Sequence, residues 1–64
     1  MELNVRKLEA ERIKLSLKKA EYSRLFNLSE TAYGKMLRKR STAISTINKI
    51  AAVLNLDPKD LLTN

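Results

Sequence analysis

The spacing of apolar residues is the strongest constraint on the fold of this 64-residue chain. Apolar residues recur at intervals of three and four, which places them on one face of successive helices. The sequence has no alternating runs of β-branched residues, and it contains one glycine and one proline. The pattern predicts an all-α protein: a single compact domain of about five short helices that spans residues 1–64.

The amino-acid composition argues against several kinds of site. There is no histidine and no cysteine, which removes disulfides, the usual zinc sites and the commonest general base. The seven acidic residues lie mostly at expected helix starts or on helix faces, so they assemble no catalytic constellation. We therefore expect no enzyme activity, metal, cofactor or small-molecule ligand. The sequence also shows no secretory signal pattern and no apolar run of membrane-spanning length, so we expect a cytoplasmic protein.

Positive charge is concentrated in one part of the chain. The 13 Lys and Arg residues outnumber the 7 Asp and Glu residues, which gives a net charge of +6 and favours a polyanionic partner. Nucleic acid and an anionic membrane surface both fit this charge, as does a basic surface that binds nothing. Residues 31–56 hold five cations and no acid, namely Lys35, Arg38, Lys39, Arg40 and Lys49.

Helix boundaries follow from residues that cap or end helices. We expect helices near residues 3–15, 17–26 and 30–38, a fourth between Thr42 and Asn55, and a last helix of a turn or two after Asp57. The expected N-caps are Ser16, Ser29, Thr42 and Asp57, and Pro58 and Asp60 strengthen the last of these. The side chains expected to face the core are Val5, Leu8, Arg12 or Leu15, Tyr22, Leu25, Phe26, Ile44, Ile47, Ile50, Ala51, Leu54 and Leu61.

The triplet Asn27-Leu28-Ser29 predicts a tight turn between two helices. Asparagine tolerates the left-handed conformation that ends a helix, and Ser29 then caps the next one. Leu28 and Tyr33 have the spacing of a hydrophobic staple. Two helices joined by so short a connection indicate a helix-turn-helix.

This arrangement resembles the helix-turn-helix family of lambdoid phage repressors, Cro proteins and their bacterial and plasmid relatives. The stretch ISTINKIAAVLNLDPKDLL, residues 44–62, is similar to the fourth and fifth helices of that family, and FNLS, residues 26–29, resembles its turn. The resemblance extends from about residue 17 onward and implies a lambda-repressor-like fold that binds double-stranded DNA. It also implies a homodimer on two half-sites, with Leu61, Leu62 and the C-terminal tail as candidate dimer surface.

Several positions depart from the family pattern. Asn27 and Ser23 stand where relatives usually have glycine and alanine, and Leu37 and Lys39 replace a glutamate and a glycine at the end of the third helix. In relatives that glutamate often pairs with an arginine of the first helix. Arg12 is therefore expected to lack its buried partner. The connection between the first two helices is also about three residues longer than in relatives, which leaves the first helix hardest to align.

A competing register remains open at this point. Residues 41–50, STAISTINKI, can themselves serve as the recognition helix, preceded by a helix over residues 29–37. That register puts Arg38, Lys39 and Arg40 into a tight turn, where glycine and an apolar residue are preferred. It also discards the match to the fourth and fifth helices.

In the favoured register, helix 30–38 reads the major groove of DNA. Six residues share its outward face by spacing, and the resemblance assigns DNA contact to the same positions: Ser29, Glu30, Thr31, Gly34, Lys35 and Arg38. Tyr33, Met36 and Leu37 point wholly or partly toward the core. Cations flanking the helix are expected to contact phosphates, and these are Lys18 and Lys19 at the start of the second helix and Lys39 and Arg40 after the third.

Each outward residue has a binding role and a structural alternative. Glu30 can accept a hydrogen bond from cytosine or merely complement the helix dipole, and Thr31 can contact thymine or remain solvated. Lys35 and Arg38 can donate to guanine or to phosphate, and no acid lies near them in sequence. Gly34 costs roughly 1 kcal/mol relative to alanine in mid-helix, which indicates either close approach to DNA or tight packing against another helix.

We therefore predict a sequence-specific double-stranded DNA-binding regulator, a repressor from a phage, plasmid or other mobile element. Two other classes fit the same fold. One is a protein-interaction module such as an antitoxin or anti-repressor, which would bind a protein tightly and discriminate bases weakly. The other is an architectural or recombination accessory DNA binder, which would show little sequence preference or bend the duplex.

Overall fold

The computed structural model describes residues 2–63, which form four α-helices, a short 3-10 helix and two short strands. The α-helices are α1 (Val5–Lys14), α2 (Lys19–Leu25), α3 (Glu30–Lys39) and α4 (Ile44–Leu54). The 3-10 helix η1 (Pro58–Leu61) follows, and the strands are β1 (Glu2–Leu3) and β2 (Leu62–Thr63). The all-α class is confirmed, with η1 in place of the fifth predicted helix, whereas the strands were not predicted.

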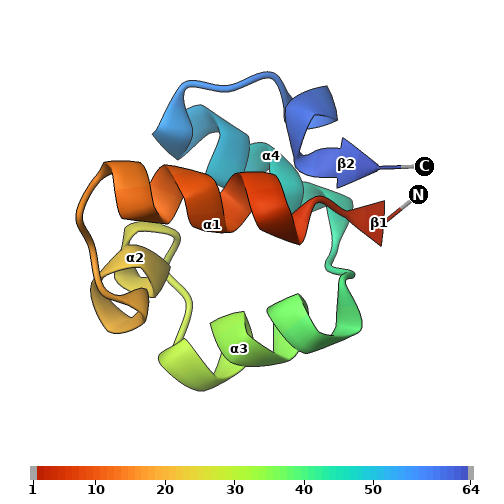
Figure 1. The fold of residues 1–64 in the computed structure, drawn as a ribbon. Helices are drawn as coiled ribbons and strands as arrows, with labels where there is room; N and C mark the ends of the chain where they lie inside the picture. Colours follow the sequence, from red (N-terminus) through yellow and green to blue (C-terminus); the bar gives the residue numbers. More distant parts are fainter. Residues whose placement is uncertain (1, 64) are drawn as a thin grey trace.

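Figure 1 shows α1 crossing the middle of the molecule, with α3 on one side of it and α4 on the other. The helix α2 lies near the C-terminal end of α1, and the two strands lie together near its N-terminal end. The strands are antiparallel, with Glu2 opposite Thr63 and Leu3 opposite Leu62. The backbone N–H of Leu3 also donates to the carbonyl of Arg40 at 2.8 Å. The N-terminal strand therefore joins β2 to the end of α3.

Residues from all four α-helices, η1 and β1 build the core. The buried apolar side chains are Leu3, Leu8, Tyr22, Phe26, Tyr33, Met36, Ile47, Ile50, Ala51 and Leu61. The ring of Tyr22 packs edge-on against Phe26 and against Tyr33, with centroid distances of 4.9 and 5.7 Å. Aromatic pairs prefer this geometry, and here it joins α2 to α3. These aromatic rings are core residues.

Three of the helices end in the same way. Ser16, Asn27 and Asn55, after α1, α2 and α4, each adopt a left-handed conformation with φ of 58°. The next residue is a leucine in every case, and its N–H donates to a carbonyl five residues earlier, at distances of 3.2, 3.0 and 2.8 Å. This is the Schellman arrangement, and each leucine packs against the core as that motif requires. The predicted left-handed turn at Asn27 and helix end at Asn55 are confirmed.

Capping by side chains is seen at three helix starts. The Ser29 hydroxyl accepts the backbone N–H three residues onward at 3.0 Å, and the Asp57 carboxylate accepts the N–H two residues onward at 2.9 Å. Both of these caps were predicted. The side-chain oxygen of Asn4 caps α1 in the same way at 3.1 Å. Helix α1 therefore begins at Val5 and not at Leu3, which belongs to β1.

Two predicted N-caps are wrong. Ser16 forms the left-handed end of α1, so α2 starts later and Lys18 occupies its N-cap position. The N–H of Lys18 donates to the Glu21 carboxylate at 3.0 Å. Thr42 is also displaced, because α4 begins at Ile44 with Ala43 at the N-cap position. In both places the turn before the helix extends further along the chain than the preference for serine or threonine at the N-cap predicts.

Most residues predicted to face the core do so, and the exceptions lie at helix ends. Leu15, Leu25 and Ile44 are 50%, 45% and 63% exposed. Leu15 follows the last residue of α1, Leu25 is the last of α2 and Ile44 the first of α4, so the apolar stripe of each helix runs past the edge of the core. Leu61 is fully buried in η1 and is therefore unavailable as dimer surface.

Candidate nucleic-acid interface

The connection between α2 and α3 forms the predicted helix-turn-helix. Residues 26–29 separate the two helices, with Asn27 in the left-handed turn and Ser29 as the cap of α3. In the competing register, residues 41–50 read DNA and Arg38, Lys39 and Arg40 lie in a tight turn, but α3 continues through Lys39 and α4 begins only at Ile44. The structure therefore favours α3 as the reading helix.

Helix α3 has one buried and one exposed face. Tyr33 and Met36 are buried and Leu37 is half-buried, as predicted. On the opposite side Gly34 is half-buried, and the exposed residues are Ser29, Glu30, Thr31, Lys35 and Arg38. All six predicted contact residues are thus at least partly accessible, while their contact with DNA stays a prediction.

The cations at the C-terminal end of α3 are available to a polyanion. Lys39 and Arg40 are exposed. Within residues 2–63 the structure has one ion pair, between Glu9 and Arg12, so none of the α3 cations is paired with a carboxylate. A groove of about 240 Å³ beside them is lined by Ala32, Lys35, Met36, Lys39, Ser41 and Thr42.

Ser41 and Thr42 are candidate phosphate contacts that the sequence interpretation missed. Both carry hydroxyl groups and line the groove next to Lys35 and Lys39. Hydroxyl side chains commonly donate to phosphate oxygens beside lysine. The signal in the sequence was a pair of short hydroxyl side chains directly after the basic cluster. Thr42 was instead interpreted as a helix N-cap.

The second predicted cationic group lies at the start of α2. Lys18 and Lys19 are both exposed there. Glu21, the nearest acid in sequence, accepts a hydrogen bond from the backbone N–H of Lys18. Its carboxylate is therefore engaged by the helix start, and neither lysine side chain forms an ion pair in the described part of the chain. The role of these lysines in phosphate contact remains a prediction.

Residues 2–63 bring together no group of three or more acidic side chains that could hold a metal ion. None of the helices that these residues form combines the length and the apolar character needed to cross a membrane.

Comparison with known families agrees with this geometry. A sequence model of the Cro/C1-type HTH DNA-binding domain matches residues 6–63, from the first turn of α1 to β2. The chain belongs to this family. Searches of curated proteins and of solved structures gave no match. The family match confirms the resemblance inferred from the turn and from residues 44–62.

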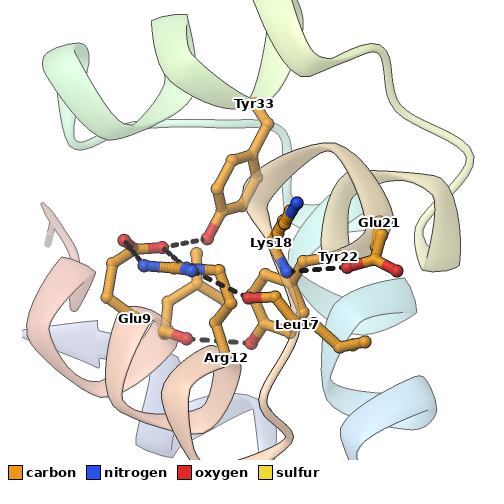
Figure 2. A network of polar contacts seen from close by, with 8 residues as sticks. Glu9, Arg12, Leu17, Lys18, Glu21, Tyr22 and Tyr33 are labelled. Atoms are coloured by element: carbon orange, nitrogen blue, oxygen red, sulfur yellow. Dashed lines mark hydrogen bonds and ion pairs between the residues drawn. The ribbon is translucent and has the colours of Figure 1, made fainter.

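A polar network next to α3 distinguishes this Cro/C1-type domain from the expected pattern (Figure 2). Arg12 lacks the third-helix partner, as expected, because Leu37 stands at that position, but it does not remain unpaired. Its guanidinium contacts both carboxylate oxygens of Glu9, one turn earlier in α1, at 3.2 Å each. It also donates to the carbonyl of Leu17 at 2.8 Å, and Glu9 accepts the hydroxyl of Tyr33 in α3 at 2.6 Å. The acid that holds Arg12 thus comes from α1 and not from α3.

The network fixes the protonation of its members. Partial burial by itself raises the pKa of Glu9, but the hydrogen bond from Tyr33 and the Arg12 guanidinium outweigh it and hold that pKa below its usual range. Burial and the bond to Glu9 raise the pKa of Tyr33, and burial raises that of Tyr22. At neutral pH, Glu9 is therefore an ionised acceptor and Tyr33 a protonated donor.

Gly34 has open space where a side chain would be. A Cβ added there would meet Nη1 of Arg38 at 3.6 Å, an ordinary van der Waals contact, and no atom of another helix within 4 Å among the described residues. Tight packing against a neighbouring helix therefore does not explain this glycine. Close approach of the α3 backbone to DNA at Gly34 stays a prediction.

We predict that Gly34→Ala raises the free energy of unfolding by about 1 kcal/mol, because alanine is the better helix former and its methyl group fits. Urea unfolding followed by circular dichroism measures this change. A loss of stability would contradict the open environment of Gly34. A fall in duplex affinity in the stabilised variant would indicate that the α3 backbone lies close to the groove floor.

Proposed function

We propose that this Cro/C1-type protein is a sequence-specific regulator that binds double-stranded DNA in the cytoplasm and represses promoters of a phage, plasmid or other mobile element. The observation that carries the proposal is that α3 has one buried apolar face and one exposed polar face. Its buried face holds Tyr33 and Met36 in the core, and its capped N-terminal end and exposed polar face are free to enter a major groove.

The proposed assignment of side chains to base contacts or to phosphate contacts follows their positions along α3. Glu30, Thr31, Lys35 and Arg38 contact base edges, with Lys35 donating to acceptors such as those of guanine. Cations at the two margins, Lys19, Lys39 and Arg40, contact phosphates together with Ser41 and Thr42. Ser29 keeps its capping bond and offers the same helix end to a phosphate. Occupation of an operator by these contacts would exclude polymerase from the promoter.

Selection from randomised duplexes tests the proposal. The purified chain is incubated with the duplex pool at near-physiological salt, and the retained DNA is sequenced. Enrichment of one motif supports a regulator, and a palindromic motif with half-sites one helical turn apart supports a dimer. Retention without enrichment would favour an architectural binder, and no retention even at low salt would favour a protein-interaction module.

Two matched substitutions separate base reading from phosphate contact. Lys39→Ala is expected to weaken binding to all duplexes by a similar factor and to reduce the slope of log K against log salt by about 1. Lys35→Ala is expected to weaken the selected site by about 1–3 kcal/mol and random DNA much less. Both lysines are exposed on α3, so neither change should disturb the fold. Equal losses on selected and random DNA in both variants would contradict the assignment.

The dimer belongs to the proposal, and we place its surface away from the predicted C-terminal one, because Leu61 is buried and Leu62 is half-buried against the core, while Asn64 lies outside the described residues. Exposed Leu15 and Val53 line a groove of about 190 Å³ between the ends of α1 and α4, together with Leu54. Glu11 and Lys14 line the same groove, so the surface carries one charge of each sign. Two copies related by a twofold axis can place Glu11 of one beside Lys14 of the other. The groove beside α3, which contains two lysines and no acid, offers no such match.

We predict that Val53→Glu weakens self-association by about tenfold or more, because it places a charge in the apolar centre of this surface. Ile44→Glu is the matched control, since Ile44 is 63% exposed at the other end of the same helix. Sedimentation over a concentration series without DNA measures both variants. Loss of association in the Ile44 variant alone would place the dimer surface elsewhere, and a monomeric wild-type chain would remove the dimer from the proposal.

A further inference from the structure

We infer that Glu9 and Tyr33 are positioning residues, which set the rotation of α3 about its own axis so that its exposed face meets base edges in one register. The inference rests on the proposed function, because it assigns a DNA-reading role to side chains that would not touch DNA. Tyr33 is fully buried and Glu9 is largely covered, so neither is offered as a contact.

The geometry links three segments through one chain of polar contacts. Tyr33, in the first half of α3, donates to Glu9 of α1 at 2.6 Å. Arg12 holds the same carboxylate by two contacts of 3.2 Å. Arg12 in turn donates to the Leu17 carbonyl at 2.8 Å, in the connection that leads into α2. Figure 2 shows Tyr33 reaching from α3 to this carboxylate, which links α3 to α1 directly and to the connection before α2 through Arg12.

In the first half of α3 the remaining contacts do not supply this constraint, and the Arg40 carbonyl, which accepts the N–H of Leu3, holds only the other end. Tyr33 and Met36 contribute apolar surface, and apolar contacts stabilise without imposing direction. A short hydrogen bond to an ionised carboxylate is directional and strong. Loss of the Tyr33 hydroxyl would leave the ring in the core but let α3 turn. Glu30, Thr31 and Lys35 project from the opposite face, so a small rotation moves all of them relative to the bases.

A second tyrosine provides the control. The Tyr22 hydroxyl donates to the Leu8 carbonyl at 2.8 Å, also on α1, and the Tyr22 ring is as buried as that of Tyr33. Tyr22→Phe therefore removes a buried hydroxyl bond of similar length without removing the polar link to α3. A role in stability alone predicts that the two Tyr→Phe changes act alike on DNA binding.

The experiment compares affinity for the selected site with affinity for random duplex, at a temperature where circular dichroism shows each variant folded. Tyr33→Phe is expected to lower affinity for the selected site about tenfold and affinity for random duplex less than about twofold. Tyr22→Phe is expected to leave the ratio of the two affinities unchanged. Glu9→Gln keeps an acceptor for Tyr33 and should retain the ratio, whereas Glu9→Ala should lower it as Tyr33→Phe does.

The outcomes distinguish the inference from the function on which it rests. A wild-type chain with no sequence preference overturns the proposed function, and this inference with it. A wild-type preference that survives both Tyr33→Phe and Glu9→Ala overturns the inference alone. The same holds if Tyr22→Phe reduces the ratio as much as Tyr33→Phe, since the effect would then follow from lost stability. If Tyr33→Phe fails to fold, Glu9→Ala decides, because Glu9 lies outside the apolar core.

Discussion

The burial of two tyrosine rings against α1 is the constraint on which the rest of the structure depends. Tyr22 of α2 and Tyr33 of α3 pack edge-on, and both are fully buried. A buried hydroxyl must find a partner, and the two hydroxyls find theirs on consecutive residues of α1, the Leu8 carbonyl and the Glu9 carboxylate. The helix α1 therefore holds both helices of the helix-turn-helix at fixed points. The relative position of α2 and α3, which determines what the exposed face of α3 can meet, follows from this arrangement.

Local rules predict the helix ends where a single rule applies and fail where two compete. Asn27 and Asn55 each precede a leucine that packs on the core, so left-handed termination was predictable at both. Ser16 is equally suited to cap the next helix, but it ends α1 instead, where Leu17 packs on the core and bonds through its N–H and its carbonyl to Arg12. The strands were unpredictable for a different reason. Each has two residues, and they pair only because the fold brings residue 3 beside residue 62.

The candidate site was also predictable only in part. Which side of α3 is exposed follows from the period of the helix, so the sequence was sufficient to predict it. The network behind α3 was not predictable, because Glu9 and Tyr33 are 24 residues apart and Glu9 belongs to the first helix, whose alignment was the least certain. The sequence also indicated that the acid usual at the end of the third helix is missing. It contained no sign that α1 supplies one, since an acid three residues before an arginine is common on exposed helices.

Arg40 carries a conformational cost at the end of α3. It adopts a left-handed conformation with φ of 53°, and its carbonyl accepts the N–H of Leu3. The backbone needs this conformation, but a side chain other than glycine or asparagine costs roughly 1–2 kcal/mol there. A cation near a helix C-terminus recovers typically 0.3–1 kcal/mol from the helix dipole when exposed, and Arg38 and Lys39 already supply that charge. Glycine would therefore give the more stable fold, and the proposed contact of Arg40 with DNA phosphate offers a reason for a cation at this position.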